Sequence, residues 1–228
     1  THGRAAAPTM VEEMADRCDG MVVMGRTVPD AVLERLHARG MPLVLLARPQ
    51  LAGIDSVKAD NTGSAEQLAA HVLGQGARRL TLVGDPAMAP DLGERWAAVG
   101  RVAAEQAGTT VTTVATPVFD EAAGRAVART ALAGTLPDAF VCANDEVALG
   151  VLSALGAAGV DVPDQVLVTG WDDIMAARYA GLTTVRQPMR ELGGTAARLL
   201  DEVITAGRAE PRHVVLPTEL VVRTTSGA

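Results

Sequence analysis

The chain has 228 residues, of which 27 are acidic and 20 are lysine or arginine, giving a formal net charge of −7 and a pI of about 5.1. This balance argues against a surface that binds nucleic-acid phosphates directly. Hydrophobic residues make up 48% of the chain, which is enough for a sizeable core. No apolar run approaches the roughly 18 residues needed to span a bilayer, and the opening segment lacks the apolar core of a signal peptide.

Apolar runs alternate with amphipathic stretches along the chain. In chain order the pattern predicts a strand over 19–25, a helix over 29–40, a strand over 42–47, a helix over 64–76, a strand over 79–84, a helix through 94–108, a strand over 110–115, a helix over 120–134, a strand over 138–143, a helix over 145–159, a strand over 165–170, a long helix over about 190–206 and two short closing runs at 213–217 and 219–223. Apolar strands separated by helices indicate parallel sheets covered on both faces. The number of strand–helix units favours an α/β protein with two doubly wound lobes.

Polar side chains follow two of the expected strands. Trp171, Asp172 and Asp173 come directly after the strand over 165–170, and Asn144 follows the strand over 138–143. In doubly wound sheets, ligands bind outside the carboxyl ends of the strands. The sequence therefore favours a binding site here over the alternative that these residues form an ordinary loop.

Several kinds of chemistry have no motif in the sequence. It contains no phosphate-binding loop, no zinc-binding H-E-x-x-H helix and no G-x-S-x-G nucleophile elbow. Its two cysteines, Cys18 and Cys142, form no spaced framework and are expected to be buried free thiols in a reducing compartment. The histidines are far apart in sequence: His2, His37, His71 and His213. Neither an enzyme nor a cofactor or metal site is predicted.

Four segments together resemble the LacI-type (lactose-repressor-like) transcriptional regulators. They are "IDSVKADN" at 54–61, "FVCANDEVALGVLSALGAAGVDVP" at 140–163, "VLVTGWDDIMAARYAGLTTVRQPMRELGGTAARLL" at 166–200 and "VVLPTELVVRTTSG" at 214–227. The resemblance covers nearly the whole chain. It implies a periplasmic-binding-protein-like fold of type I, with a small effector bound between two lobes and controlling a DNA-binding head in a homodimer.

The resemblance also implies lobe boundaries and partners. The N-terminal lobe is expected at 1–59 and 188–216, and the C-terminal lobe at 60–187 and 217–228, with the chain crossing near Ala59–Asp60, Gln187–Pro188 and Pro217. The effector is expected to be a sugar or related metabolite, and the protein is expected in the cytoplasm without membrane contact. Operator DNA would be bound only through an N-terminal helix-turn-helix that this chain does not contain.

The sequence departs from the family pattern in two places. The segment "PTMVEEMADRCDG" at 8–20 resembles the second helix of the N-terminal lobe, so the strand–helix–strand that would precede it is expected to be missing and the chain to be a fragment. In "LVLLARPQ", Ala47 stands where the family commonly has an aspartate that binds ligand hydroxyls. This second departure puts an ordinary sugar ligand in question.

Three candidate ligand-binding residues follow from matching positions in the family. Asp172 matches the first aspartate of the family's pair, although it could instead cap a loop. Arg95 matches an arginine directed into the cleft, with a solvated helix arginine as the alternative. Phe119 matches an aromatic residue that stacks on the ligand, with core packing as the alternative.

The remaining candidates rest on their neighbourhood in the sequence. Asn144 could cap a helix, bind ligand or do both, and Trp171 could offer a flat face. Asp91, one turn before Arg95, and Gln187, beside a lobe crossing, complete the candidate set. Asp173 is expected to cap the short helix that follows it. Asp145 and Glu146 are interpreted as structural because negative charge suits the first turn of a helix.

Three functions compete at this point. The first is the effector-sensing and dimerisation domain of a LacI-type regulator, which the motifs favour. The second is a solute-binding protein of a sugar transporter, which shares the two-lobed fold. The third, an enzyme using Asp172 and Asp173 as an acid–base pair, ranks last because adjacent residues on one loop rarely face a common bond.

Overall fold

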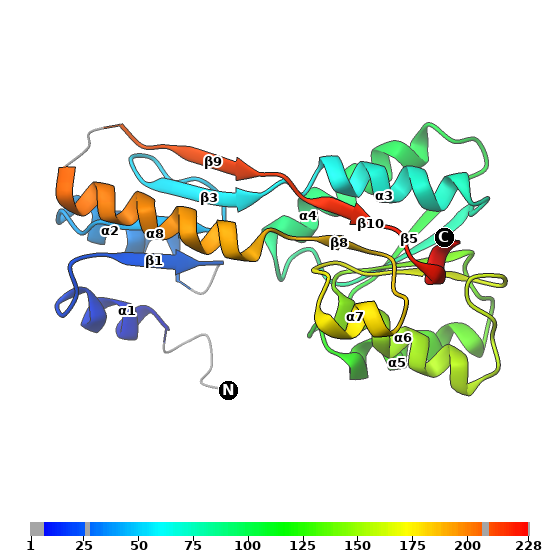
Figure 1. The fold of residues 1–228 in the computed structure, drawn as a ribbon. Helices are drawn as coiled ribbons and strands as arrows, with labels where there is room; N and C mark the ends of the chain where they lie inside the picture. The colour runs from blue at the N-terminus through cyan, green and yellow to red at the C-terminus, as the bar shows by residue number, and fades with distance from the viewer. Residues whose placement is uncertain (1–6, 26–27, 207–209, 228) are drawn as a thin grey trace. The chain divides into compact units, whose positions relative to one another are not determined.

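The computed structural model describes residues 7–25, 28–206 and 210–227. The chain divides into two compact units (Figure 1). Unit 1 comprises Thr1–Asp60 and Pro188–Pro217, and unit 2 comprises Asn61–Gln187 and Thr218–Ala228. Within the described ranges, no helix has the length and apolar character needed to cross a membrane.

Unit 1 is built on one parallel sheet with the strand order β1-β2-β3-β9. Its elements are α1 (Ala7–Ala15), β1 (Met21–Met24), α2 (Asp30–Ala38), β2 (Leu43–Leu46), β3 (Asp55–Ala59), α8 (Met189–Ala206) and β9 (His213–Leu216). The α2 residues Leu33 and Leu36 pack with Leu43 and Leu45 in one buried cluster. A second cluster joins α8 to Val44 and Val57, so helices cover both faces of the sheet.

Unit 2 contains a second parallel sheet with the order β5-β4-β6-β7. Its elements are α3 (Gly63–Gly74), β4 (Arg79–Val83), α4 (Pro90–Ala104), β5 (Thr110–Val114), α5 (Glu121–Leu132), β6 (Ala139–Cys142), α6 (Asp145–Ala157), β7 (Leu167–Thr169), α7 (Met175–Tyr179), β8 (Thr184–Arg186), β10 (Glu219–Val221) and the 3-10 helix η2 (Thr224–Ser226). Both sheets confirm the predicted α/β class with doubly wound parallel sheets.

The two faces of the unit 2 sheet follow the period-two alternation of strand β6. Ala139 and Val141 belong to the cluster that contains α3 and α4, whereas Phe140 and Cys142 belong to the cluster that contains α5 and α6. Successive side chains of a strand point to opposite faces, so an entirely apolar strand requires helices on both. The continuous apolar run of β6 is therefore explained by its central place in the sheet.

Helices α5 and α6 pack closely near the carboxyl edge of this sheet. A Cβ atom at Gly124 would lie 2.0 Å from the carbonyl oxygen of Val147, and one at Gly150 would lie 2.1 Å from that of Glu121. Only glycine allows backbones to approach this closely. This crossing fixes the start of α6, and therefore Asn144, against the segment that leads into α5.

Two sequence-based expectations are wrong in detail. The chain forms a two-stranded antiparallel ribbon of β8 and β10, which the expected parallel architecture did not include. Strand β10 lies in the expected closing run at 219–223, but β8 was not expected, because a strand of three residues gives no periodic pattern. Cys142 is buried as expected, but Cys18 is exposed, because it follows α1 in a turn outside the core.

Candidate functional site

The candidate site lies within unit 2, at the carboxyl edge of its sheet. Strands β4, β6 and β7 are parallel, so the residues that follow them meet at one edge. Asn144 follows β6 by one residue, and Trp171 and Asp172 follow β7 after Gly170. Helix α4 supplies Arg95 to the same place, because Arg95 lies on the buried face of that helix.

Arg95 is held in a fixed position by the protein. Its guanidinium carbon lies 4.1 Å from the centroid of the Trp171 ring, a cation–π distance. Its Nε atom donates to Oδ1 of Asn61 at 2.9 Å, and its Nη1 atom donates to the carbonyl oxygen of Ala143 at 3.1 Å. Burial lowers the pKa of Arg95 to about 10, although Asp172, Asp91 and Glu94 oppose the shift. Arg95 therefore remains positively charged at neutral pH.

Trp171 retains an unused hydrogen-bond donor. The residue is 2% exposed, and its indole N–H finds no acceptor in the part of the chain that the structure describes. Buried indole N–H groups usually have a partner, because leaving one unsatisfied costs about 1–3 kcal/mol. A polar ligand can supply the missing acceptor for this indole N–H, which lies beside the fixed positive charge of Arg95.

Asp172 contributes an acceptor next to this donor. Its Oδ1 atom accepts a hydrogen bond from Nε2 of Gln187 at 2.6 Å. Burial raises the pKa of the Asp172 carboxyl, while the hydrogen bond from Gln187 and the charge of Arg95 act in the opposite direction. A carboxylate has about four acceptor positions, so Asp172 can accept further bonds from ligand hydroxyls.

The loop that carries Asp172 has an unusual backbone. Asp172 has φ of 110° and Asp173 has φ of 54°, a region that residues other than glycine rarely occupy. Asp172 donates its backbone N–H to Val185 at 2.9 Å, which ties the loop to β8. Such conformations persist where surrounding contacts over-determine them, and they cluster at binding sites.

Asp173 does not cap α7, which corrects the sequence-based expectation. The residue preceding α7 is Ile174, and no side chain caps that helix. The Asp173 carboxylate instead accepts from Nε of Arg186 at 2.7 Å and from Nη2 of Arg223 at 2.6 Å. Its two partners come from distant parts of the sequence, and the left-handed backbone turns the side chain towards them and away from α7.

Asn144 and Phe119 form a second part of the edge. Asn144 caps α6 by accepting from the backbone N–H of Val147 at 2.9 Å, which confirms its capping role. Its side-chain Nδ2 donates to the carbonyl oxygen of Phe119 at 3.1 Å. Phe119 is partly buried against both cores of unit 2. Asp91 lies in the first turn of α4, where its charge acts on Arg95.

The structure thus groups Arg95, Trp171, Asp172 and Gln187 directly, and it joins Asn144 to Phe119 beside them. Sequence reasoning missed Asn61, which is 1% exposed, orients Arg95 and also donates to Glu94 at 3.2 Å. Asn61 ends the segment "KADN", which matches the family pattern but gives no sign of the bond to Arg95. The described residues contain no cluster of three histidine, cysteine or acidic side chains that could hold a metal ion.

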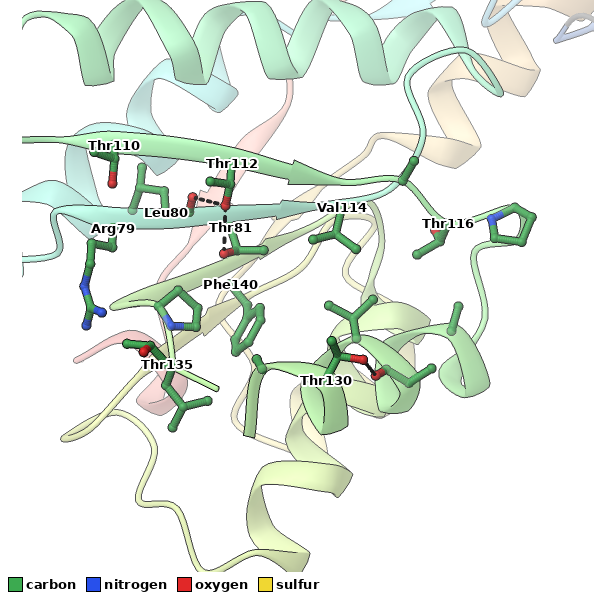
Figure 2. A pocket seen from close by; sticks show the side chains of 18 residues that line it. Arg79, Leu80, Thr81, Thr110, Thr112, Val114, Thr116, Thr130, Thr135 and Phe140 are labelled. Carbon is green, nitrogen blue, oxygen red and sulfur yellow. Dashed lines mark hydrogen bonds between the residues drawn. The ribbon is translucent and has the colours of Figure 1, made fainter. Parts of the chain in front are cut away.

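Unit 2 also has a groove that lies between β5 and α5, away from the candidate site. Figure 2 shows this groove, of about 510 Å³, between the β5 side chains of Thr110, Thr112 and Val114 and helix α5, with Phe140 lining it. None of the candidate site residues lines it. Its lining is apolar and threonine-rich, and its one charged side chain, Arg79, is paired with Asp138 at 2.6 Å.

A parallel α/β unit with a partly buried polar cluster at the carboxyl edge of its sheet is the architecture of a small-molecule-binding domain. Residues 69–226 match the family described as the periplasmic binding protein-like domain. The chain belongs to this family.

Comparisons with individual proteins match the chain to regulators of the LacI type. The chain is 29% identical over 228 residues to the HTH-type transcriptional repressor MelR of Bacillus subtilis, covering 95% of this chain and 65% of MelR. A LacI-family regulator structure from Sanguibacter keddieii is 32% identical, with a TM-score of 0.84 and coverage of 99% of this chain and 84% of that one. The transcriptional regulator CelR–cellobiose complex is 28% identical, with a TM-score of 0.84 and coverage of 97% and 70%.

These matches confirm the resemblance to LacI-type regulators. They also show that the chain spans about two thirds of the length of the curated relatives, with 65% of MelR and 66% of catabolite control protein A from Staphylococcus aureus covered. MelR and the similar MalR of Streptomyces coelicolor are named as regulators of transcription.

Proposed function

We propose that this chain is the effector-sensing domain of a LacI-type transcriptional regulator and that it binds a sugar or related metabolite at the carboxyl edge of the unit 2 sheet. The observation that carries the proposal is the indole N–H of Trp171. It is buried, it has no acceptor among the described residues, and it lies beneath Arg95 on the same loop as Asp172.

The chemistry of this cluster suits a polyhydroxylated ligand. Arg95 and Trp171 offer donors, and Asp172 offers an acceptor, so neighbouring hydroxyl groups could use all three. The CelR structure contains cellobiose, which makes saccharides the first class to test. Asn144, Phe119, Asp91 and Gln187 complete the proposed binding set, with Gln187 acting through its bond to Asp172.

A thermal-shift and calorimetric screen of mono- and disaccharides, including cellobiose, tests this proposal. A ligand at a hundred times its dissociation constant should stabilise the wild-type fold by about 2.7 kcal/mol. Asp172→Ala should weaken binding by about tenfold to a hundredfold, because a hydrogen bond to a charged group contributes about 1.5–3 kcal/mol. Asp120→Ala, which removes only the cap of α5, is the matched control and should leave affinity unchanged. Stabilisation by no saccharide, with binding of an unrelated ligand class, would contradict the proposal.

The finer parts of the function are also proposals. Operator DNA would be bound by another part of the regulator, since the net charge of −7 gives this chain little attraction for phosphates. A regulator of this kind works beside DNA in the cytoplasm. Catalysis is not part of the proposed role, because the carboxylates of Asp172 and Asp173 bind different partners and do not face a common bond.

We also propose that the domain self-associates through β5. All five residues of this edge strand are exposed, and Val111, Val114 and Val118 are 36%, 38% and 53% exposed. The segment 109–119 contains no charged residue, although 21% of the chain is charged. An uncharged edge strand presents unpaired backbone groups to another strand, and two copies of an acidic chain repel least along such a segment.

Sedimentation velocity tests this surface with a charge-matched pair. Thr112→Lys places a charge in the middle of β5 and should convert a dimer to a monomer. Gln106→Lys places the same charge on an exposed residue beyond α4 and should leave the dimer intact. Equal dimerisation of both variants would exclude β5 as the contact.

A further inference from the structure

A buried carboxylate lies behind the loop that carries Trp171 and Asp172. It belongs to Asp145, the first residue of α6, which is 0% exposed. Asp145 was expected to serve only the helix dipole. A dipole interaction needs no burial, because acidic side chains stabilise helix starts from the surface. The burial of this charge therefore requires another explanation.

Asp145 fastens both ends of the loop. Its backbone N–H donates to the carbonyl oxygen of Trp171 at 2.8 Å. Its Oδ2 atom accepts from the backbone N–H of Ile174 at 2.9 Å, and its Oδ1 atom accepts from the hydroxyl of Thr184 at 2.6 Å. One residue thus holds the segment 171–174 at its first and last positions and ties it to β8.

Thr184 extends this contact into the middle of the loop. While its hydroxyl donates to Asp145, the same oxygen accepts from the backbone N–H of Asp173 at 3.4 Å. Gly170 leaves room for the carboxylate, since a Cβ atom there would lie 2.2 Å from Oδ1 of Asp145. Loop and carboxylate are therefore fitted to each other, and the two positive φ angles lie between the fastened ends.

The charge is unfavourable where it lies. Burial raises the pKa of Asp145 to about 6, the bonds from Thr184 and Ile174 oppose the shift, and the charges of Asp172 and Asp173 add to it. The described arginines nearby are engaged elsewhere: Arg186 and Arg223 bind Asp173, and Arg95 stacks on Trp171. Costly buried charges of this kind concentrate at functional sites.

We propose that Asp145 is a positioning residue for ligand binding, and that its carboxylate holds the Trp171–Asp172 loop in the strained geometry that binds the effector. The proposal rests on the function proposed above. Asp145 itself offers no group to the ligand, because it is 0% exposed and lies behind the loop. It acts only through the loop.

The role requires a carboxylate rather than an amide. Two donors, the Ile174 N–H and the Thr184 hydroxyl, converge on different oxygens of Asp145. Asparagine has one acceptor oxygen and one NH₂ group, so Asp145→Asn would keep the bond from Ile174 only if the Thr184 hydroxyl turned and accepted. The hydroxyl proton of Thr184 would then lose its acceptor on Asp145, and both contacts would lose their charge assistance. The loop should then relax from its strained backbone.

The first test reads the loop without any ligand. In a Trp96→Phe background, Trp171 is the remaining tryptophan, so near-ultraviolet circular dichroism and emission report on it alone. Asp145→Asn should change both signals, and Thr184→Val, which removes one donor and keeps the volume, should change them in the same direction. Asp120→Asn makes the same chemical change at the N-cap of α5, outside the loop, and should change neither signal. Spectra of Asp145→Asn and Thr184→Val that match the parent would overturn the proposal.

The second test reads binding, with cellobiose as the probe. Asp145→Asn should weaken cellobiose at least tenfold, and its effect should not add to that of Thr184→Val in a double-mutant cycle, since both act on one contact. Altered spectra with unchanged affinity would make Asp145 a residue of the fold only and would overturn the proposal. If the parent does not bind cellobiose, the same cycle is measured with a saccharide that the screen identifies. If no saccharide binds, the proposed function fails, whereas unchanged ligand-free spectra would overturn the role of Asp145 on their own. Thr184→Val provides both readouts if Asp145→Asn does not fold.

Discussion

The carboxyl ends of β2 and β7 place a non-glycine residue in the same rare backbone region. Ala47 follows β2 with φ of 50°, and Asp172 follows β7 with φ of 110°. At β7, the side chain is bonded to Gln187, faces Arg95 and lies in a polar cluster. At β2, the side chain is a methyl group. Both strand ends have positive φ, but their polar groups differ: the β7 turn presents the carboxylate of Asp172, whereas the polar group at the β2 turn is Arg48, the residue after Ala47.

The difference indicates what each turn does. After Ala47 the chain directs Arg48 into the interior of unit 1, where its guanidinium donates to the carbonyl oxygen of Val28 at 3.2 Å and bonds to Asp30. That turn serves the core of unit 1. The turn at Asp172 is held by Asp145 and β8, and it presents a carboxylate beside an unused indole donor. Arg48 also keeps Nε and Nη1 without a partner among the described residues, so neither backbone strain nor an unsatisfied buried donor identifies a binding site by itself. The β7 turn differs because its unused donor lies beside the carboxylate of Asp172 and the cation of Arg95.

The largest loss of stability is expected at Gly170, where the turn after β7 has no space for a side chain. Gly170→Ala would bring a Cβ atom to 2.2 Å from Oδ1 of Asp145. Because the carboxylate is fully buried, the loop must shift, and the free energy of unfolding should fall by about 3 kcal/mol. Gly25→Ala, after β1, meets open space at positive φ and should cost only about 1 kcal/mol. Chemical denaturation compares the two variants, and equal losses would show that the β7 turn is not tightly fitted.

Asp173 should give an intermediate effect with a distinctive pH dependence. Burial alone would raise its pKa, but hydrogen bonds from Arg223 and Arg186 outweigh this and hold the pKa below 3.8. A depressed folded-state pKa stabilises the fold above the unfolded-state pKa, and this stability is lost as the pH falls through the folded value. Asp173→Asn should therefore lower stability by about 1–2 kcal/mol at pH 7.

The pH series separates this role from that of its neighbour. The stability difference between wild type and Asp173→Asn should remain constant from pH 7 to pH 5 and close below about pH 3.8. Asp172 has a raised pKa, so its substitution should not show that pattern. A difference for Asp173→Asn that is independent of pH throughout would mean that its two ion pairs do not stabilise the fold.

The smallest effects are expected at Ala47. Ala47→Gly should raise stability by about 0.5 kcal/mol, because relief of the left-handed strain exceeds the entropy that glycine adds to the unfolded state. Thermal melts of the variant and the wild type measure this change. A lower melting temperature for Ala47→Gly would show that the backbone at Ala47 is not strained.

The sequence was sufficient for the parallel sheets and for the candidate edge, because both depend on patterns that are local. Alternating strands and helices predict the architecture, and a polar group after an apolar strand marks its carboxyl end. The partners of Asp173 could not be predicted, since Arg186 and Arg223 lie 13 and 50 residues away. Asp145 and Asn61 were missed for a similar reason, because burial depends on packing between segments that sequence spacing does not show.

The proposed site depends on the Trp171 indole N–H being ready to donate to a ligand acceptor. Its resonance in a nitrogen–proton correlation spectrum of the Trp96→Phe protein, recorded during a saccharide titration, measures this directly. We expect a single indole signal that moves downfield on binding, as for a newly hydrogen-bonded N–H, and a much weaker response in Asp172→Ala. Tight saccharide binding with an unmoved indole signal would contradict it.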